Sequence, residues 1–424
     1  MWLEVLLAGT LTIGQGSSAP TDAQPPSTPT PSPVDVRVFV PPPAAAPATE
    51  AKAPAVTAPD RWLFMREAQG TWVGALLDDH RMSVSGWVDA SFTASTDRHD
   101  QLPMGFNFLA NQGALQQGWV RVERTVDQTA TTPTFGFRSD TFFGIDYRFT
   151  LARGLADWQL TVDHGEPNQY GYDPVQFYAE AYFPHLGRGT DVKVGRFFCQ
   201  FGVEVIDATQ NQFVSHAYNF IYNPFTHTGL LTTLKLSDAW SVQNGIVTGA
   251  DMFIAPGANP TYVGSVKWAP PTGRDSVLFA VIVGKGSYDV TNSFSNPEIF
   301  DLVYVHKFSD RLTYTVDALY SFQYGYPGAG ASGFVNNWGV VQYLTYQLTP
   351  KLSATGRLEF FDDVQGQRTG FKGLYKAVTT GVTYKPTPYL WLRPEVRFDN
   401  NADSRPFEGK PNLFTAAFDC ILRW

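Results

Sequence analysis

The chain has 424 residues, of which 17% are charged and 15% are aromatic, and its formal net charge is −8. The charged fraction lies below the roughly 25% that is usual for soluble proteins. The acidic balance argues against a nucleic-acid partner, because such a partner requires clustered Lys and Arg. No stretch approaches the roughly 18 consecutive apolar residues of a transmembrane helix, yet aromatic side chains are abundant. The apolar residues must therefore be interleaved with polar ones.

The N-terminal region has the composition of an export signal followed by a tether. Residues 1–19 are predicted to be a signal peptide, because an apolar stretch precedes a run of small residues. This stretch departs from the usual pattern, since it carries Glu4 and lacks Lys and Arg. Residues 20–60 are rich in Pro, Ala and Thr, which predicts a disordered periplasmic linker. Residues 61–81 are predicted to form a short helical or irregular segment.

From residue 82 onward the side chains alternate with a period of two. In the stretch 82–94, Val84 and Val88 share one face, while Ser85 and Asp89 share the other. Successive side chains of an extended strand point to opposite faces, so one face is apolar and the other polar. The same alternation recurs in 174–183, where it assigns Val175 to the apolar face, and in 311–324, 351–361 and 389–399.

The last of these stretches places Arg393, Glu395, Arg397 and Asp399 on a single face. Four charges on one face would be intolerable in the packed core of a soluble sandwich, but they suit a water-filled lumen. A transmembrane barrel requires this alternation, because each strand faces lipid on one side and the interior on the other. The predicted fold class is therefore all-β, a transmembrane antiparallel up-and-down β-barrel over residues 82–424.

The links between the predicted strands alternate between short and long. The short links are expected near 127–134, 184–190, 237–238, 270–275, 309–310, 349–350 and 386–388. The long links are expected at 95–114, 146–173, 202–227, 286–297, 325–334, 362–373 and 400–411. Bacterial barrels have short periplasmic turns and long external loops. Seven periplasmic turns, with both ends of the barrel in the periplasm, predict about 16 strands, with 14 or 18 as alternatives.

The C-terminal strand has the pattern of a barrel-assembly signal. Phe418, Leu422 and the terminal Trp424 lie on one alternating face. The last strand of outer-membrane barrels is similar, in that it alternates and ends in an aromatic residue. We therefore expect these three residues to be read by the barrel-assembly machinery.

Several motifs along the chain match those of one known family. They are Val194-Gly195-Arg196-Phe197, Gly202 with Glu204, Ser215-His216-Ala217-Tyr218, Pro224-Phe225-Thr226-His227-Thr228-Gly229 and Leu236-Ser237-Asp238. With these motifs the chain resembles the OmpL-like β-barrel porin family, over about residues 83–424. The resemblance implies an outer-membrane location in a diderm bacterium and a porin fold. Phosphate-selective porins share a weaker likeness, but their anion specificity is not carried over, because no loop here holds a cluster of Lys or Arg.

The polar faces of the predicted strands supply candidate pore-lining residues of both signs. They are Arg121, Glu123, Arg138, Asp140, Glu180, Lys193, Lys235, Lys267, Asp301, Lys307, Asp317, Arg357, Glu359, Arg393, Glu395 and Arg397. Neighbouring opposite charges would create a transverse field without a clear preference for cations or anions. For most of these residues taken singly, a structural ion pair on the wall is the alternative.

The loop 202–227 is long enough to narrow the pore. We expect it to fold inward and to form part of a constriction, with Glu204, Asp207, His216, Tyr218 and His227 as candidates. An external loop packed on its neighbours is the alternative. The loop 146–173 and the segment 60–80 could also close the lumen.

The predicted function is passive diffusion of small hydrophilic solutes or ions through an outer-membrane porin. Outer-membrane lipid, these solutes and the barrel-assembly machinery are the expected partners, and a homotrimer is possible by analogy. No catalytic residue, metal site or cofactor is expected, since no metal-binding or nucleophile motif occurs. A structural or adhesive barrel with a plugged lumen is the main alternative. A barrel hydrolase that uses Ser215, His216 or His227 with Asp207 is a weaker one.

Overall fold

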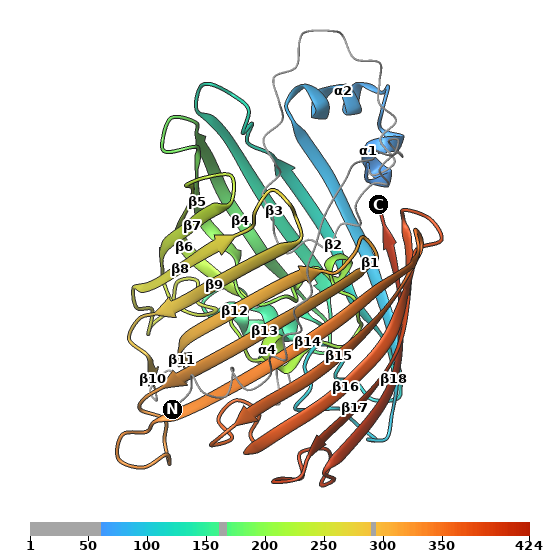
Figure 1. Ribbon diagram of the computed structural model, residues 1–424, viewed down its shortest axis with the longest axis vertical. Coiled ribbons are helices and arrows are strands. Elements are labelled where there is room, and N and C mark those ends of the chain that lie inside the picture. Colours follow the sequence, from blue (N-terminus) through green and yellow to red (C-terminus); the bar gives the residue numbers. More distant parts are fainter. Residues whose placement is uncertain (1–60, 161–167, 290–293) are drawn as a thin grey trace, which may run out of the picture. The chain divides into compact units, whose positions relative to one another are not determined.

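The computed structural model describes residues 61–160, 168–289 and 294–424, all of which belong to one compact unit. Sixteen antiparallel strands form a closed barrel in which each strand pairs with its neighbours along the chain, and the first strand pairs with the last (Figure 1). The fold class and the strand number predicted from the sequence are confirmed. The predicted signal peptide and linker lie in residues 1–60, outside the described residues.

The barrel strands are β1 (Met82–Ser95), β2 (Gln112–Arg124), β3 (Thr134–Gly144), β4 (Gly171–Phe183), β5 (Thr190–Phe198), β6 (Thr226–Lys235), β7 (Trp240–Val247), β8 (Thr261–Trp268), β9 (Asp275–Val283), β12 (Glu298–Lys307), β13 (Leu312–Gln323), β14 (Val335–Thr349), β15 (Leu352–Asp363), β16 (Gly373–Tyr384), β17 (Leu390–Asn401) and β18 (Asn412–Arg423). A small hairpin of β10 (Ser287–Asp289) and β11 (Phe294–Asn296) lies in the link between β9 and β12. The helices are α1 (Leu63–Glu67), α2 (Trp72–Asp79), α3 (Tyr147–Thr150) and α4 (Tyr218–Ile221), with short 3-10 turns at Asp157–Leu160 and Ala208–Gln210.

The alternation along each strand separates an apolar outer face from a polar inner face. In β1, Val88 is 42% exposed on the outside of the barrel, while Asp89 is 3% exposed on the inside. In β17, Val396 and Phe398 are exposed, whereas Arg393 and Arg397 are buried in the interior. The exposed apolar face is the one that meets lipid hydrocarbon in a transmembrane barrel.

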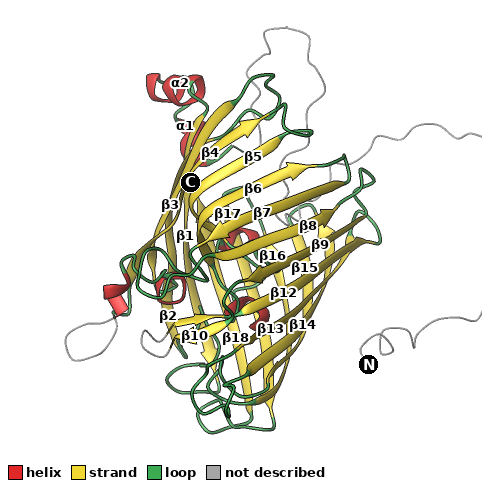
Figure 2. Ribbon diagram, turned by 90° about the vertical axis from the view of Figure 1, so that its left-hand side faces the viewer, coloured by secondary structure: helices red, strands yellow, loops and turns green. Residues whose placement is uncertain are grey.

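The links between the strands alternate in length as the sequence indicates. Seven short links are observed, at 125–133, 184–189, 236–239, 269–274, 308–311, 350–351 and 385–389. Eight long links lie at the other end, at 96–111, 145–170, 199–225, 248–260, 284–297, 324–334, 364–372 and 402–411. The link 248–260 was not among the predicted long links, although it holds Gly249, Pro256 and Gly257. Figure 2 shows the short turns at the end of the barrel where α1 and α2 lie.

A bulge in β4 corrects one assignment of the alternation. The pairing of β3 with β4 shifts register between Asp140 and Phe142, so Pro174 and Val175 are accommodated opposite a single residue. On one side of such a bulge, each side chain points to the face opposite to the one that a strict alternation predicts. Val175 therefore packs in the interior, fully buried, although the strict period of two assigned it to the outer apolar face.

The segment 61–81 forms α1 and α2 at the short-turn end. The side chain of Thr71 caps α2 by accepting a hydrogen bond from the N–H of Gly74 at 3.2 Å. Trp62 stacks on Trp87 of β1 with ring centroids 6.2 Å apart, and the guanidinium of Arg423 lies 4.0 Å from the Trp62 ring. These contacts attach the segment to the mouth of the barrel.

No helix among the described residues is long and apolar enough to span a membrane.

The barrel closes through the last residue of the chain. The N–H of Trp424 donates to the carbonyl of Gly86 at 2.8 Å, and the N–H of Gly86 donates to the carbonyl of Trp424 at 3.0 Å. Phe418 and Leu422 are exposed on the outer face of β18. Recognition of these residues by the assembly machinery stays a prediction.

The two-faced pattern leads to a depth-dependent prediction. We expect Val396→Arg, at the middle of the outer face of β17, to lower the free energy of unfolding by about 2–4 kcal/mol, because a charge at the bilayer midplane is poorly solvated. Leu390→Arg at the turn end of the same strand is the matched control, with an expected cost of about 0–1 kcal/mol. Denaturant titration in liposomes measures both values. Equal costs at the two positions would contradict the assigned membrane depth.

Candidate pore constriction

The link between β5 and β6, residues 199–225, folds into the barrel and is here named the inner loop. Its helix α4 lies within the outline of the barrel in both views (Figures 1 and 2). Among the described residues, the inner loop forms hydrogen bonds or ion pairs with side chains of eight wall strands, namely β2, β7, β12, β13, β14, β15, β16 and β17.

The first arm of the inner loop is attached to carboxylates of β12 and β13. The N–H of Gly202 donates to Asp301 at 2.6 Å, and the N–H of Val203 donates to Asp317 at 3.1 Å. The side-chain amide of Asn219 donates to Asp317 from the returning arm at 2.8 Å. A buried backbone N–H must find an acceptor, and here the wall supplies it.

Glu204 is the main ionic anchor of the inner loop. Its carboxylate lies 2.7 Å from Nη1 of Arg357 and accepts hydrogen bonds from the hydroxyl of Tyr343 at 2.8 Å and the N–H of Ala217 at 2.9 Å, while Nδ1 of His216 lies at 2.8 Å. Burial alone would raise the pKa of Glu204. The charge of Arg357 and the contact with His216 outweigh burial and lower the pKa to about 2. Glu204 is therefore ionised at neutral pH.

Behind the inner loop, arginines and carboxylates alternate across β15 and β17. Glu359 lies 2.8 Å from Nε of Arg357 and 2.9 Å from Nη1 of Arg397, and Asp399 lies 2.7 Å from Nη2 of Arg397. Tyr218 of the inner loop donates its N–H to Glu359 and its hydroxyl to Asp399, both at 2.9 Å. This row of charges contacts the loop and not bulk water, since each of the four charged residues is at most 1% exposed.

The middle of the inner loop is held by three further charges. Arg393 donates to the carbonyls of Ala208 and Asn211 at 2.9 and 2.8 Å. Glu395 accepts the N–H of Val214 at 2.7 Å. Arg121 of β2 lies 3.0 Å from Asp207 and 2.8 Å from Asp140 of β3.

These contacts revise the environment that the sequence analysis assigned to β17. The four charges of that strand were expected in a water-filled lumen, but all four are at most 5% exposed. They are tolerated because peptide groups of the inner loop, the hydroxyl of Tyr218 and charged side chains of the wall satisfy them. The prediction for their role in lining the pore is not tested by this placement.

Three further candidate wall residues, Asp140, Asp301 and Asp317, are buried. The remaining candidates lie nearer the short turns and are half-buried. Glu123 lies 3.8 Å from Arg138, and Glu180 lies 3.5 Å from Lys193. Lys235 lies 3.7 Å from Asp238 in the adjacent turn. Lys267 and Lys307 lie at the same ends of β8 and β12.

The structure separates one residue from the proposed constriction. Glu204, Asp207, His216 and Tyr218 all lie on the inner loop, but His227 lies in β6, where it pairs with Phe197 in the ladder. Its Nδ1 contacts the carbonyl of Gly249 at 3.1 Å. The strand begins one residue before His227, so its backbone is used for sheet pairing and not for the loop.

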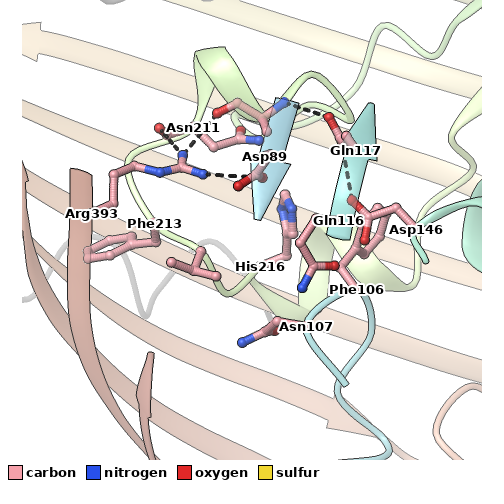
Figure 3. Close-up of a pocket in the computed structure, with 12 residues that line it drawn as sticks. Asp89, Phe106, Asn107, Gln116, Gln117, Asp146, Asn211, Phe213, His216 and Arg393 are labelled. Atoms are coloured by element: carbon pink, nitrogen blue, oxygen red, sulfur yellow. Dashed lines mark hydrogen bonds and ion pairs between the residues drawn. The ribbon is translucent and has the colours of Figure 1, made fainter. Parts of the chain in front are cut away.

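A small cavity beside the inner loop is lined by several residues outside the predicted constriction (Figure 3). Asp89, Asp146 and Gln117 line it together with Phe106 from the link between β1 and β2. Its volume is about 10 Å³, which is room for one water molecule and too little for an organic solute. Asp89 stood on the polar face of its strand and could have been found, whereas the loop residues carried no periodic signal.

Burial has a direct electrostatic effect at this cavity. Asp146, in the link after β3, has its pKa raised to about 8 by burial, although a hydrogen bond from Gln117 at 2.8 Å acts in the opposite direction. Because a carboxyl with a raised pKa is protonated at neutral pH, Asp146 does not add a full negative charge to the interior.

Comparison with known proteins relates this geometry to a family. The family described as "Putative beta-barrel porin-2, OmpL-like" matches residues 81–423. The chain belongs to this family. It is an outer-membrane porin, as the resemblance in its motifs indicated. No match was found among curated proteins.

Solved structures share the fold of this porin. An anion-selective porin from Comamonas acidovorans is 8% identical, with 81% of this chain and 99% of that chain covered and a TM-score of 0.52. The outer-membrane channel DcaP of Acinetobacter baumannii is 13% identical, with 81% and 97% covered and a TM-score of 0.51. OprB of Pseudomonas putida is 12% identical, with 83% and 96% covered and a TM-score of 0.53. At these identities the likeness concerns the fold alone.

The Glu204–Arg357 contact leads to a stability prediction for the porin. Arg357→Met removes the cation between Glu204 and Glu359, and we expect the loss of about 3–5 kcal/mol of unfolding free energy, because two buried carboxylates lose their partner. Adding Glu204→Gln to this variant should recover part of the loss. A double-mutant cycle by denaturant titration measures the coupling, and strictly additive costs would contradict a direct anchor.

The pKa of Glu204 leads to a prediction about acid. A lowered carboxylate pKa stabilises the folded loop fully above the ordinary value of 4.5, and this contribution is lost as the pH falls through about 2. The ¹³C shift of the Glu204 carboxyl, assigned by its absence in Glu204→Gln, should therefore titrate near pH 2. A titration midpoint at or above pH 4.5 would show that Arg357 does not lower the pKa of Glu204.

Proposed function

We propose that this porin allows passive diffusion of small hydrophilic solutes or ions, without catalysis, past a constriction formed by the inner loop. A 16-stranded barrel is wide enough to leave an aqueous channel. The observation that carries the proposal is the attachment of the inner loop to eight wall strands inside the barrel, counted over the described residues. A loop with so many charged anchors is held at a defined position, as a size filter requires.

The proposed route follows the wall that the inner loop leaves in contact with water. Half-buried polar side chains on β3, β4, β5, β7 and β8 support this assignment, among them Arg138, Glu180, Lys193, Ser241 and Lys267. The charges behind the loop on β15 and β17 then act as anchors of the constriction. Glu204, Asp207, His216 and Tyr218 are its proposed loop residues.

A plugged structural barrel remains the second candidate function. The burial of Arg357, Arg393 and Arg397, each at most 2% exposed, favours it, because water does not reach that part of the interior. A conductance measurement on the folded chain separates the two functions.

The contacts of the former hydrolase candidates support a channel without catalysis. The hydroxyl of Ser215 accepts a hydrogen bond from Nη2 of Arg357 at 2.9 Å, and Nδ1 of His216 contacts Glu204. Asp207 contacts Arg121 and caps the turn at Thr209. The side chains of Ser215, His216 and Asp207 thus all form contacts that hold the loop. A catalytic serine would instead need a hydrogen bond to a neighbouring base.

The outer surface supports the remaining proposed partners. Outer-membrane lipid would cover the apolar outer face, and the assembly machinery would read Phe418, Leu422 and Trp424. A homotrimer is a further proposal by analogy with porins, and the mass of the detergent-solubilised protein tests it.

The test of the constriction is the single-channel conductance of the folded full chain in a planar bilayer. Replacement of residues 208–218 by a short Gly-Ser linker removes the middle of the inner loop, and we expect a larger conductance because the channel is widened. Replacement of residues 327–332, in the exposed link between β13 and β14, is the matched control and should leave the conductance unchanged.

The outcomes distinguish the candidate functions. Stable open steps in the natural chain support a porin, and equal conductance of the two replacement variants would contradict a constriction at the inner loop. A folded natural chain that never conducts, together with a conducting 208–218 variant, would favour the plugged barrel.

A further inference from the structure

The inner loop divides the interior charges into two groups. Those on β15 and β17 are buried against the loop, as described above. Those between the inner loop and the short turns, a region here named the lower lumen, are half-buried and reach water. The second group lies where a passing solute would meet it, whereas the first is buried against close partners. The mixture of acids and bases among the predicted pore-lining residues therefore does not describe the charge of the lower lumen.

Three lysines dominate one side of the lower lumen and are here named the lysine sector. They are Lys235 at the end of β6, Lys267 near the end of β8 and Lys307 at the end of β12. Each shares the inward face with a buried residue four positions earlier, namely Leu231, Val263 and Val303. The alternation of the strands therefore directs all three lysines inward.

The ladder places two of these lysines at one level. Lys235 and Lys267 are both partners of Ser241 on the intervening strand β7. Two strand spacings separate them, which is about 10 Å. Lumen-facing residues beside them, such as Gln243 and Ser265, are uncharged. The positive charges are thus close enough for their fields to add.

The strands β2 to β5, which adjoin the lysine sector, are close to neutral in the lower lumen. Glu123 lies 3.8 Å from Arg138, and Glu180 lies 3.5 Å from Lys193. Asp191 accepts a hydrogen bond from Gln128 at 3.2 Å and adds one acid. Five bases therefore share the lower lumen with three acids on the strands β2 to β12.

One acid faces the lysine sector from a turn. Asp238 lies 3.7 Å from Lys235, but its side chain is 71% exposed, and it also lies 3.3 Å from Arg188. An exposed pair of this kind is strongly screened by water. Asp238 therefore reduces the field of the lysine sector without cancelling it.

From this arrangement we infer that the lysine sector gives the channel a preference for anions, and that small solutes bearing carboxylate or phosphate groups are its favoured class. The inference rests on the proposed function, because it requires an open route. A cleft lined by one sign of charge between low-dielectric walls concentrates the counter-ion. The loops need hold no basic cluster, since the wall supplies the charge.

The test is the reversal potential of the folded full chain in a planar bilayer under a tenfold KCl gradient. The salt is kept near or below about 0.1 M, where the Debye length is still about 10 Å. We expect chloride to be several-fold more permeant than potassium. The triple variant Lys235→Gln, Lys267→Gln, Lys307→Gln should bring the permeability ratio close to one, with single-channel steps retained.

A matched variant controls for the loss of three charges at the same end of the barrel. Arg274→Gln, Arg311→Gln, Lys351→Gln removes three exposed bases from the short turns and should leave most of the anion preference intact. Protection of the folded barrel from trypsin verifies that both variants are folded.

The outcomes separate this inference from the proposed function. Open steps with no anion preference, or with equal effects of the two triple variants, would overturn the inference and leave the porin function standing. A folded chain without open steps would overturn both. Selective entry of chloride that is lost only in the lysine-sector variant supports the inference.

Discussion

A peptide chain that crosses the inside of a barrel must satisfy its buried N–H and C=O groups away from bulk water. The inner loop is too irregular to do so with its own backbone, and the wall supplies the partners. Carboxylates of Asp301, Asp317 and Glu395 accept its N–H groups, and Arg393 donates to its carbonyls. The position of the inner loop follows from this requirement, since moving the loop would leave both the loop and the wall unsatisfied.

The same requirement explains why strong charges occur in a dry part of the interior. A buried ion is tolerated where close partners replace the water that it has lost. Glu204 meets this condition through Arg357 and the groups around it, and Glu359 meets it through two arginines. These contacts define one position for the loop more than they add stability, because the gain from each pair is largely offset by desolvation.

The inner loop divides the wall of the barrel into a part that it covers and a part that it leaves uncovered. Where the inner loop covers the wall, side chains hold structure. Where it does not, polar side chains of β5 to β12 are only half-buried. Water, and not the sign of a residue, decides which charges a solute experiences, because close pairing in a dry region cancels the field of the anchors.

The sequence by itself determined the fold, because a strand between lipid and the barrel interior follows a local rule: apolar side chains that face lipid alternate with side chains that face the interior. That rule indicated sixteen strands and the faces of Val88, Asp89 and Val396, and it failed at Val175, where a bulge shifts the parity. The length and motifs of the link after β5 also marked a loop that could enter the barrel. The contacts of Glu204 and Tyr218, and the separation of buried anchors from the lysine sector, were decided only by the tertiary structure. They join residues more than 100 positions apart, and no local pattern records which wall residues a loop will cover.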